Sequence, residues 1–292
     1  MTRTPTLTPV ARTDDEIRAW VKDQKMQGHK VGFVPTMGAL HKGHLSLVKT
    51  ALKHCDTVVA SIFVNPTQFA PHEDFDSYPR AEDTDLEKLA SVGCALAYCP
   101  GAKDIYPDGN CTEVYVNGLS SILEGEHRPH FFGGVVNVVL RLFNHVAPDV
   151  AVFGEKDYQQ LQIIKRMTKD LGLPIEVIGA ETMREADGLA MSSRNQYLSK
   201  KDRETVSALP RALIKAISEI EAGGSIKNAL EEAKSAISKA GLSPIDYVRV
   251  CNASTLEDIT TDTLEASVEA RILAAAWMGK TRLIDNMPVK RT

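Results

Sequence analysis

The middle of the chain alternates between short apolar, β-branched runs and amphipathic stretches, and this alternation restricts the possible folds more than any other feature. The runs typical of strands are Lys30–Thr36, Thr57–Val64, Ala95–Cys99, Asp149–Phe153 and Ile175–Ile178. The segments with helical periodicity between them are His44–His54, Glu82–Ser91, Gly134–Val146 and Tyr158–Leu171. This order favours a parallel sheet covered on both faces, in which ligands bind beyond the carboxyl ends of the strands.

The pattern changes after Leu198, where two charged amphipathic helices are predicted at Lys200–Glu221 and Ser225–Ala240. Strand-like segments follow at Asp246–Cys251, Arg271–Trp277 and Thr281–Asp285, the last two joined by the hairpin signal Met278-Gly279-Lys280. A chain of 292 residues favours two domains. We therefore predict an α/β domain over residues 1–184 and a smaller α+β domain over residues 185–292.

The bulk composition indicates a globular protein that acts on small molecules. Hydrophobic residues make up 43% of the chain and charged residues 25%, which excludes a disordered or fibrous protein. Lys and Arg number 34 against 38 Asp and Glu, a net charge of -4. A chain of this charge has no overall field that would collect nucleic acid or an anionic membrane, so neither is expected as a partner.

The cysteines and the first residues of the chain both favour a cytoplasmic location. The five cysteines include no CxxC pair and are odd in number, so we expect free thiols rather than a disulfide framework or a zinc site. They are Cys55, Cys94, Cys99, Cys111 and Cys251. Met1–Trp20 contains no apolar run, so it predicts neither a signal peptide nor a membrane span.

The turn after the first predicted strand carries two histidines three residues apart, His41 and His44, where a helix begins. The N-terminus of a helix favours phosphate oxygens through its unpaired N–H groups and its dipole. Imidazoles there would add hydrogen-bond donors, and Gly38 and Gly43 would let the backbone approach a ligand. Two alternatives stay open for an isolated HxxH pair: solvated histidines at a helix start, or a metal pair for which the nearby sequence offers no third ligand.

Two further clusters offer groups that bind phosphate. Gly154-Glu155-Lys156-Asp157 follows the strand at Asp149–Phe153, and the ammonium of Lys156 can act as a point charge on a phosphate. Met191-Ser192-Ser193-Arg194 offers two hydroxyls and a guanidinium in a loop. Taken alone, this loop is weak evidence, because serine is a common residue in any turn. Gln159 and Gln160 lie in the helix that follows Asp157, and the alternative for them is an ordinary exposed position on that helix.

The HxGH turn and the MSSR loop together resemble the paired signatures of the nucleotidyl-transferring superfamily that includes class I aminoacyl-tRNA synthetases. Longer runs in the chain are similar to those of the pantothenate synthetase family, in the same order: PTMGALHKGHLSLV, FVNPTQF, FGEKDYQQL and READGLAMSSRNQYLS. They cover roughly Val31 to Ser199. The resemblance implies a Rossmann-like parallel-sheet domain with an HxGH nucleotide-binding turn, plus a smaller C-terminal α+β lid domain.

The resemblance also implies a reaction: (R)-pantoate attacks the α-phosphate of ATP, pyrophosphate leaves, and β-alanine then attacks the bound pantoyl adenylate to give pantothenate and AMP. No protein nucleophile is needed, in keeping with the absence of a Ser-His-Asp or Cys-His pattern. Mg²⁺ is the implied metal cofactor, with unknown protein ligands. Asp85 is a candidate contact for it, and solvated helix surface is the alternative. A homodimer is expected.

Site residues are carried over position by position from the family. The implied ATP-binding residues are Met37, Gly38, His41, His44, Gly154, Glu155, Lys156, Asp157, Met183, Met191, Ser192, Ser193 and Arg194. Gln68 and Gln160 would bind pantoate. The implied catalytic residues are His44 as proton donor, His41, Lys156 and Arg194. One position departs from the family: Phe131 stands where the family motif Arg-x-Gly-His-Phe-x-Gly has its histidine, and His130 precedes it.

Other functions remain open from the residues alone. A cytidylyl- or adenylyltransferase would release a stable nucleotide conjugate instead of AMP. A nucleic-acid-binding module descended from a tRNA synthetase is disfavoured by the acidic net charge and by the lack of a basic, aromatic-interleaved stretch. An inactive relative is disfavoured by the presence of His41, His44, Lys156 and Arg194.

Overall fold

The computed structural model describes residues 7–70, 75–76 and 78–291, which leaves the first six residues of the predicted N-terminal segment and Thr292 outside it. Contacts divide the chain into two compact units. The first unit reaches residue 155 and includes residues 163–181, and the second combines residues 156–162 with the chain from residue 182 onward. The short segment 156–162 therefore belongs with the C-terminal part of the chain, although it follows the parallel sheet directly in sequence.

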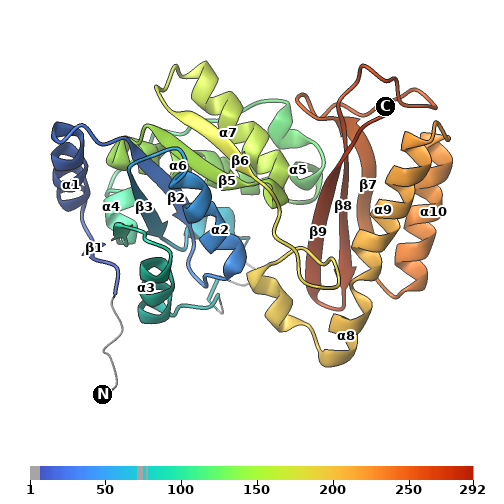
Figure 1. Cartoon of the computed structure of the whole chain (residues 1–292), viewed down its shortest axis with the longest axis horizontal. Coiled ribbons are helices and arrows are strands. Elements are labelled where there is room, and N and C mark those ends of the chain that lie inside the picture. The colour runs from blue at the N-terminus through green and yellow to red at the C-terminus, as the bar shows by residue number, and fades with distance from the viewer. Residues whose placement is uncertain (1–6, 71–74, 77, 292) are drawn as a thin grey trace. The chain divides into compact units, whose positions relative to one another are not determined.

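A six-stranded sheet forms the centre of the first unit, with the strand order β1-β4-β3-β2-β5-β6 (Figure 1). Its strands are β1 (Val10–Ala11), β2 (Val31–Thr36), β3 (Thr57–Ile62), β4 (Leu96–Tyr98), β5 (Val150–Gly154) and β6 (Glu176–Ala180). Every pairing between neighbouring strands is parallel. The five strands predicted from the apolar runs are confirmed, each within two residues at either end, and β1 was not predicted.

The order of the strands places a topological switch point between β2 and β5. From β2 the chain adds β3 and then β4 on one side, and it later returns to place β5 and β6 on the other side. Ligands of open α/β sheets bind where the strand order reverses, beyond the carboxyl ends of the strands. The turn after β2 and the residues that follow β5 both lie at this point.

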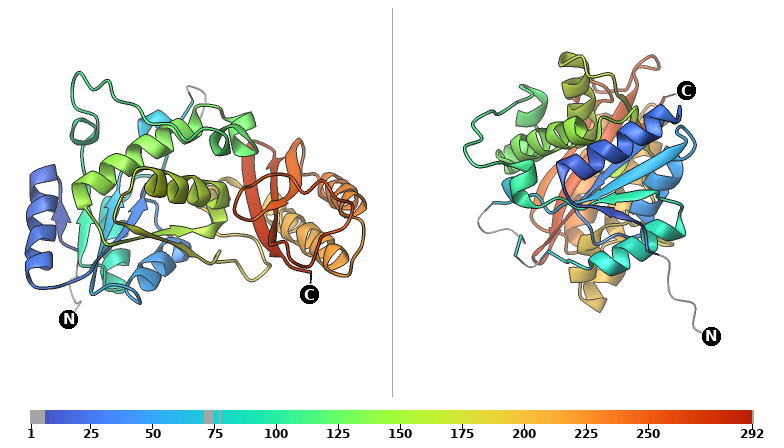
Figure 2. Two further views of the ribbon diagram at one scale, coloured as in Figure 1. Left: turned by 90° about the horizontal axis from the view of Figure 1, so that it is seen from above. Right: turned by 90° about the vertical axis from the view of Figure 1, so that its left-hand side faces the viewer.

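Helices cover both faces of this sheet (Figure 2). They are α1 (Asp14–Met26), α2 (Lys42–Ala51), α3 (Glu82–Ser91), α4 (Ala102–Ile105), α5 (Glu124–His127), α6 (Phe131–Val146) and α7 (Tyr158–Asp170). Successive residues of a strand point to opposite faces, so Val34 packs with Leu47 and Leu89 on one side while Phe33 meets Phe143 of α6 on the other. The ring centroids of the two phenylalanines are 6.3 Å apart.

Helix α1 was not among the predicted helices, although the sequence contains a local signal for it. Thr13 accepts a hydrogen bond from the Glu16 N–H (3.3 Å), and the carboxylate of Glu16 accepts one from the Thr13 N–H (3.3 Å). This capping box satisfies backbone donors that a helix start leaves unpaired. Helix α6 is rich in apolar residues, yet no helix in the described ranges combines the length and apolarity needed to cross a bilayer.

A buried hydrogen bond joins β4 to α6 away from the sheet's carboxyl edge. The hydroxyl of Tyr98 lies 2.8 Å from Nδ1 of His145. The phenol can donate or accept in this contact, depending on the tautomer of the imidazole. Burial disfavours the charged form of His145, so we expect its protonation to oppose folding.

His145 is expected to make folding less favourable as the pH falls. Burial lowers its pKa, and the surrounding charges act both ways: Asp14 and Asp104 raise it, while Arg18 and Arg141 lower it. Since the folded-state pKa is depressed, the contribution is complete above the unfolded value of about 6.5 and is lost below it. Urea unfolding at about pH 7.5 and 5.5 should show a smaller stability loss in His145→Gln than in wild type. Equal losses would remove His145 as the cause.

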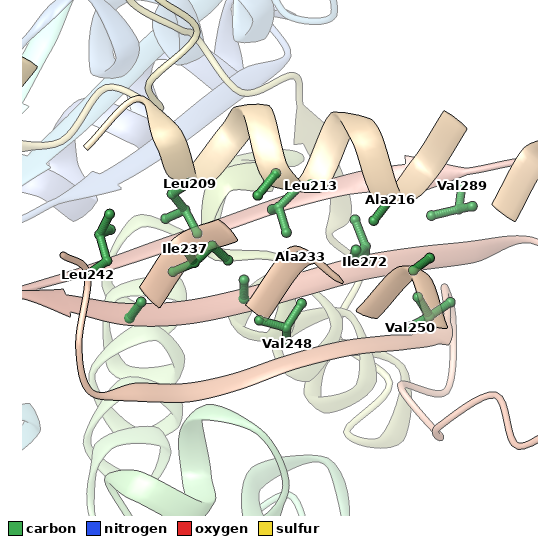
Figure 3. Packing of buried hydrophobic residues seen from close by; sticks show 14 of the residues in the cluster. Leu209, Leu213, Ala216, Ala233, Ile237, Leu242, Val248, Val250, Ile272 and Val289 are labelled. Atoms are coloured by element: carbon green, nitrogen blue, oxygen red, sulfur yellow. The ribbon is translucent and has the colours of Figure 1, made fainter. Parts of the chain in front are cut away.

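The second unit has its own sheet and core. The antiparallel strands β7 (Ile245–Asn252), β8 (Ala270–Met278) and β9 (Thr281–Val289) lie in sequence order, and α9 (Ala208–Glu221) and α10 (Ile226–Lys239) cover one face. Figure 3 shows Leu213 of α9, Ile237 of α10 and Val250 of β7 in the apolar layer between helices and sheet. The predicted fold class, a parallel α/β domain plus a smaller α+β domain, is confirmed.

The single helix predicted over Lys200–Glu221 is wrong, because the structure has two helices there, α8 (Lys200–Thr205) and α9. Pro210 is the third residue of α9. Proline has no N–H to donate and its ring clashes with the preceding turn, so it fits only where a helix begins. The chain accordingly ends α8 at Thr205 and starts a new helix two residues before Pro210. The hairpin predicted at Met278–Lys280 forms, with Gly279 at φ 58°.

Candidate active site

The turn between β2 and α2 reverses the chain through two left-handed residues, Gly38 (φ 81°) and Ala39 (φ 52°). Thr36 fixes its start, because its hydroxyl donates to the Ser61 carbonyl (2.6 Å) and accepts from the Gly38 N–H (3.2 Å). A Cβ on Gly38 would lie 3.2 Å from both the Asp85 carboxylate and a methyl of Ile62. Glycine is therefore required there both by conformation and by space.

The two histidines form a reciprocal cap at the start of α2. Nδ1 of His41 accepts from the Gly43 N–H (3.1 Å), and Nδ1 of His44 accepts from the His41 N–H (3.3 Å). The rings lie side by side, with centroids 4.1 Å apart. Because a backbone N–H can only donate, both Nδ1 atoms are unprotonated, and each neutral imidazole carries its proton on Nε2. The cap thus turns both histidines into Nε2–H donors at a helix N-terminus, which suits phosphate oxygens.

Two side chains of α3 fix the backbone of this turn through hydrogen bonds to Leu40. The Leu40 N–H donates to Oδ1 of Asp85 (2.8 Å), and the ammonium of Lys88 donates to the Leu40 carbonyl (2.7 Å). Lys88 also lies 3.6 Å from Asp85 Oδ1. Asp85 is 1% exposed, so its alternative role as solvated helix surface is wrong. The buried carboxylate of Asp85 and the partly exposed ammonium of Lys88 thus fix both backbone groups of the residue that precedes His41.

Gln68 lies in the 3₁₀ turn η1 (Pro66–Gln68), which follows β3 at the same edge of the sheet. The buried amide of Asn65 orients it: Nδ2 of Asn65 donates to Oε1 of Gln68 (3.1 Å) and to the Gly134 carbonyl (3.1 Å). Since Oε1 of Gln68 accepts that bond, its Nε2 is the donor, and it lies 3.0 Å from the Met37 sulfur. This contact brings the predicted pantoate residue beside the predicted nucleotide turn.

Asn65 was not selected from the sequence, although it stands inside the FVNPTQF run. Its Oδ1 accepts hydrogen bonds from the Thr67 N–H (3.3 Å), the Thr67 hydroxyl (3.0 Å) and the Tyr106 hydroxyl (2.9 Å). With Nδ2 donating twice, the amide is fully hydrogen-bonded and 1% exposed. Such a network fixes one orientation, so Asn65 sets which way Gln68 presents its amide.

Arg128, in the segment that departs from the family motif, is hydrogen-bonded to the backbone of Gln68. Arg128 donates to the Gln68 carbonyl (3.3 Å) and lies 3.3 Å from the Glu124 carboxylate. Its guanidinium sits 4.0 Å from the centroid of the Phe131 ring. His130 is an exposed residue at the start of α6 and makes no side-chain cap. At the position of the family histidine, Phe131 thus supports the arginine that holds the backbone of Gln68.

Gly154 and Glu155 complete the part of the predicted site that belongs to the first unit. Gly154 ends β5, the strand that pairs with β2 across the switch point, and Glu155 begins the 3₁₀ turn η3 (Glu155–Asp157). A Cβ on Gly154 would meet only Leu47, at an ordinary 3.8 Å. The first unit therefore gathers Met37, Gly38, His41, His44, Gln68, Gly154 and Glu155 at the carboxyl edge of its sheet.

The second unit holds the other predicted residues. Lys156 and Asp157 precede α7, with the ammonium 3.7 Å from the Asp157 carboxylate, and Gln160 is partly buried in the first turn of that helix. Gln159, its neighbour, is buried at 5% exposure, so the exposed-surface role considered for it is wrong. Of the two clusters predicted to bind phosphate, Lys156 and Asp157 of the first and the whole of Met191–Arg194 belong to this unit.

The loop that carries MSSR is built on a narrow backbone hairpin. The Met191 N–H donates to the Met183 carbonyl (2.9 Å), and Arg184 pairs with Ala190 in an antiparallel bridge. Ser192 caps the 3₁₀ turn η4 (Ser193–Tyr197) by accepting from the Arg194 N–H (3.2 Å). The pairing places the backbones of Met183 and Met191 side by side, although the two residues are eight positions apart in sequence.

The predicted site residues of each unit carry groups of the kinds that bind anions. Throughout the described ranges, no group of three or more His, Cys, Asp or Glu side chains could hold a metal ion, so a metal pair built on HxxH has no third protein ligand there. What the residues offer are imidazole, ammonium and guanidinium donors and the N-terminus of α2. These groups stabilise phosphate charge without supplying a nucleophile.

Comparison with known proteins agrees with this geometry. The sequence profile of the family described as Pantoate-beta-alanine ligase matches residues 9–288. The pantothenate synthetase of Hyphomonas neptunium is 55% identical over 283 residues, covering 97% of each chain. The pantothenate synthetase structure from Thermus thermophilus superposes with a TM-score of 0.90 at 43% identity, covering 97% of this chain and 100% of that one.

A second solved structure carries ligands. It is described as pantoate-beta-alanine ligase from Francisella tularensis complexed with beta-gamma ATP and beta-alanine, and it matches with a TM-score of 0.80 at 36% identity. The match covers 96% of this chain and 97% of that one. A family match over nearly the whole sequence, relatives above half identity and the same fold at full length lead to one conclusion. The chain belongs to the pantoate-beta-alanine ligase family.

Proposed function

We propose that this protein condenses (R)-pantoate with β-alanine to give pantothenate, AMP and pyrophosphate. A carboxylate oxygen of pantoate attacks the α-phosphorus of ATP, and the bond to pyrophosphate breaks. The amine of β-alanine then attacks the carbonyl carbon of the pantoyl adenylate, AMP leaves, and the amine loses a proton. The observation that carries the proposal is the HxGH turn at the sheet's switch point, with both Nδ1 atoms occupied by backbone N–H groups, in a member of this family.

The residues that we propose for ATP contact it through side chains or through backbone groups, and the cations and imidazoles among them donate to its phosphates. In the first unit these are His41, His44 and the backbone around Met37, Gly38, Gly154 and Glu155. In the second unit they are Lys156, Asp157, Met183, Met191, Ser192, Ser193 and Arg194. His41, His44, Lys156 and Arg194 would be catalytic, because negative charge builds on the phosphate oxygens as the carboxylate attacks and fixed donors stabilise it. Holding the carboxylate and the α-phosphate in line also lowers the activation barrier, because much of the entropy cost of bringing the two groups together is met when the substrates bind.

For pantoate we propose Gln68 and Gln160. The amide of Gln68 is held by Asn65 with its Nε2 as donor, which suits the carboxylate and hydroxyl oxygens of pantoate. The amide is 8% exposed, and its Nε2 meets only the Met37 sulfur, a weak acceptor that an oxygen of pantoate can replace. The adenylate forms beside it, since Met37 of the nucleotide turn is in contact with the same amide.

Mg²⁺ is the metal cofactor that we propose. Asp85 fits as a protein ligand, since its buried Oδ2 has no hydrogen-bond partner among the described residues and carboxylate oxygens are the donors that Mg²⁺ prefers. Triphosphate and water oxygens would supply the other ligands, as is usual for this ion. When bound with ATP, the ion would neutralise charge on the phosphates.

Several properties follow from the proposed function and the family. We expect a cytoplasmic homodimer that binds small-molecule substrates, without a nucleic acid or membrane partner. Residues 1–184 would bind nucleotide and pantoate, and residues 185–292 would act as a lid that excludes water from a hydrolysable adenylate. Small-angle scattering with and without ATP and pantoate tests the lid, and no compaction with both substrates would count against it.

An assay for AMP release tests the function directly. Purified protein with ATP, Mg²⁺, pantoate and β-alanine should form AMP at a steady rate, and omitting either organic substrate should abolish steady turnover. A stable nucleotide conjugate in place of AMP would indicate a nucleotidyltransferase. ATP binding without any product would refute the proposed acceptor while leaving the nucleotide site in place.

A further inference from the structure

Two adjacent residues of β9, Asp285 and Asn286, are buried and polar in a strand that is otherwise part of the C-terminal core. Asp285 is 3% exposed and Asn286 is 4% exposed. Successive strand residues point to opposite faces of a sheet. Leu283 and Val289 face the helices, so Asp285 shares their face, and Asn286 lies on the other face. The pair therefore reaches both sides of the strand.

On the helix-covered face, Asp285 anchors the hairpin that carries the MSSR loop. Its two carboxylate oxygens accept from the two terminal nitrogens of Arg184, both at 2.9 Å. Arg184 also donates to the Gly188 carbonyl (2.9 Å) and the Asn286 carbonyl (3.3 Å). A bidentate guanidinium pair fixes direction as well as distance. Arg184, near the start of the hairpin, is thereby fixed to β9.

On the opposite face, Asn286 holds the backbone of Lys156. Its Nδ2 donates to the Lys156 carbonyl at 2.8 Å, and its Oδ1 accepts from Nε of Arg271 at 2.5 Å. Arg271 lies on β8, diagonal to Asn286 in the register, and its guanidinium stacks 3.8 Å from the Tyr158 ring centroid. The Tyr158 hydroxyl donates to the Ala253 carbonyl (2.9 Å). The segment that begins with Lys156 is thus packed and hydrogen-bonded to the C-terminal sheet.

We propose that Asp285 and Asn286 are positioning residues for catalysis. The dipeptide couples the two phosphate-binding segments of the second unit: Asn286 acts through Lys156, and Asp285 acts through Arg184 on the loop that ends in Arg194. This inference rests on the proposed function of Lys156 and Arg194. In this proposal neither Asp285 nor Asn286 contacts the phosphates. Each fixes the backbone from which a cationic side chain extends, and a displacement of about 1 Å in such a group can lower a rate up to about 10²-fold.

Asn286→Asp is the sharpest variant for testing this role. It exchanges the Nδ2 donor for an oxygen that faces the Lys156 carbonyl, while the acceptor for Arg271 remains. We expect the rate of adenylate formation, measured as pantoate-dependent ATP–pyrophosphate exchange, to fall about tenfold. The KM for pantoate should change less than the rate, because Gln68, one of its two proposed ligands, belongs to the first unit.

A double-mutant cycle separates positioning from general loosening. If Asn286 acts through Lys156, adding Asn286→Asp to Lys156→Ala should lower the rate no further than Lys156→Ala alone. Independent effects that multiply would overturn the inference. Asp246→Asn serves as a control, because it weakens a pair of the same sheet, Asp246 with Arg282, of similarly low exposure. That variant should change thermal stability more than the exchange rate.

The same experiment keeps the inference apart from the proposed function. Wild-type protein without pantoate-dependent exchange would refute the function, whereas active wild type with fully active Asn286→Asp would refute the inference alone. Calorimetric binding of ATP gives a readout that needs no turnover. Affinity should fall in Asn286→Asp and in Lys156→Ala without multiplying in the double variant. Asp285→Asn, which keeps one acceptor for Arg184, should weaken ATP binding even when Lys156 is alanine, because it acts on the other segment.

Discussion

His44→Asn is expected to fold normally and to form the pantoyl adenylate about 10²-fold more slowly than wild type. The Nδ1 atom of His44 accepts the His41 N–H, and an asparagine amide oxygen can take over that bond. The variant therefore keeps the cap of α2 and removes only the Nε2–H donor. The loss of rate would measure the imidazole's contact with the phosphates, because the helix start is preserved.

Comparison with His44→Ala separates the two roles of the side chain. Alanine also removes the half of the cap that His44 supplies, while the bond from the Gly43 N–H to His41 remains, so this variant should lose up to about 1 kcal/mol of unfolding free energy in addition to the rate. His54→Ala, at an exposed position just beyond α2, is the control and should match wild type in both measurements. Single-turnover formation of the adenylate at saturating ATP gives the rate. Near-wild-type turnover in His44→Asn would show that the histidine serves the cap alone.

Gly134→Ala is expected to disrupt pantoate binding and to destabilise the first unit by roughly 1–3 kcal/mol. A Cβ at this position would lie 2.6 Å from the Thr67 carbonyl oxygen and 2.8 Å from the α-carbon of Gln68. Those atoms are backbone, so the whole η1 turn must move away from α6. The shift would also break the bond from Asn65 to the Gly134 carbonyl, which orients Gln68.

Gly133→Ala is a matched control one residue earlier in the same helical turn. There a Cβ would meet only the exposed ring of Tyr115, at 3.3 Å, and a flexible side chain can move aside. Steady-state kinetics should show a higher KM for pantoate in Gly134→Ala, with a smaller change for ATP, and little change in Gly133→Ala. Urea unfolding measures the stability of both. Equal behaviour of the two variants would contradict a role for the close approach of α6 to Gln68.

The strands and helices that carry the site could be predicted because their signals are local. The β2 and β5 runs are apolar in consecutive residues, and the HxGH turn contains its own cap, since the partners of His41 and His44 lie two and three residues apart. The break before Pro210 was equally local and was overlooked. The order of the motifs also indicated the family, because four sequence runs can be matched along the chain without knowing which residues are in contact.

The sequence could not identify the residues that position these motifs. For Asp85 the sequence left a magnesium contact and solvated helix surface open, and neither showed that it accepts a hydrogen bond from Leu40, 45 residues earlier, at 1% exposure. Asn286 lies just beyond the strand predicted at Thr281–Asp285 and was not selected, yet it holds the carbonyl of Lys156, 130 residues away. No periodicity or spacing marks such pairs.

The division between the two kinds of information follows from the range of the forces involved. By itself the sequence determined the alternation of strands and helices, the position of the HxGH turn and the family, because backbone periodicity and helix capping depend on neighbours within a few residues. Only the tertiary structure decided that Asp85 is buried, that Gly134 must lack a side chain, and that Asp285 and Asn286 hold the Arg184 hairpin and the backbone of Lys156. Burial and hydrogen bonding at those positions are set by residues that the fold brings together from distant parts of the chain.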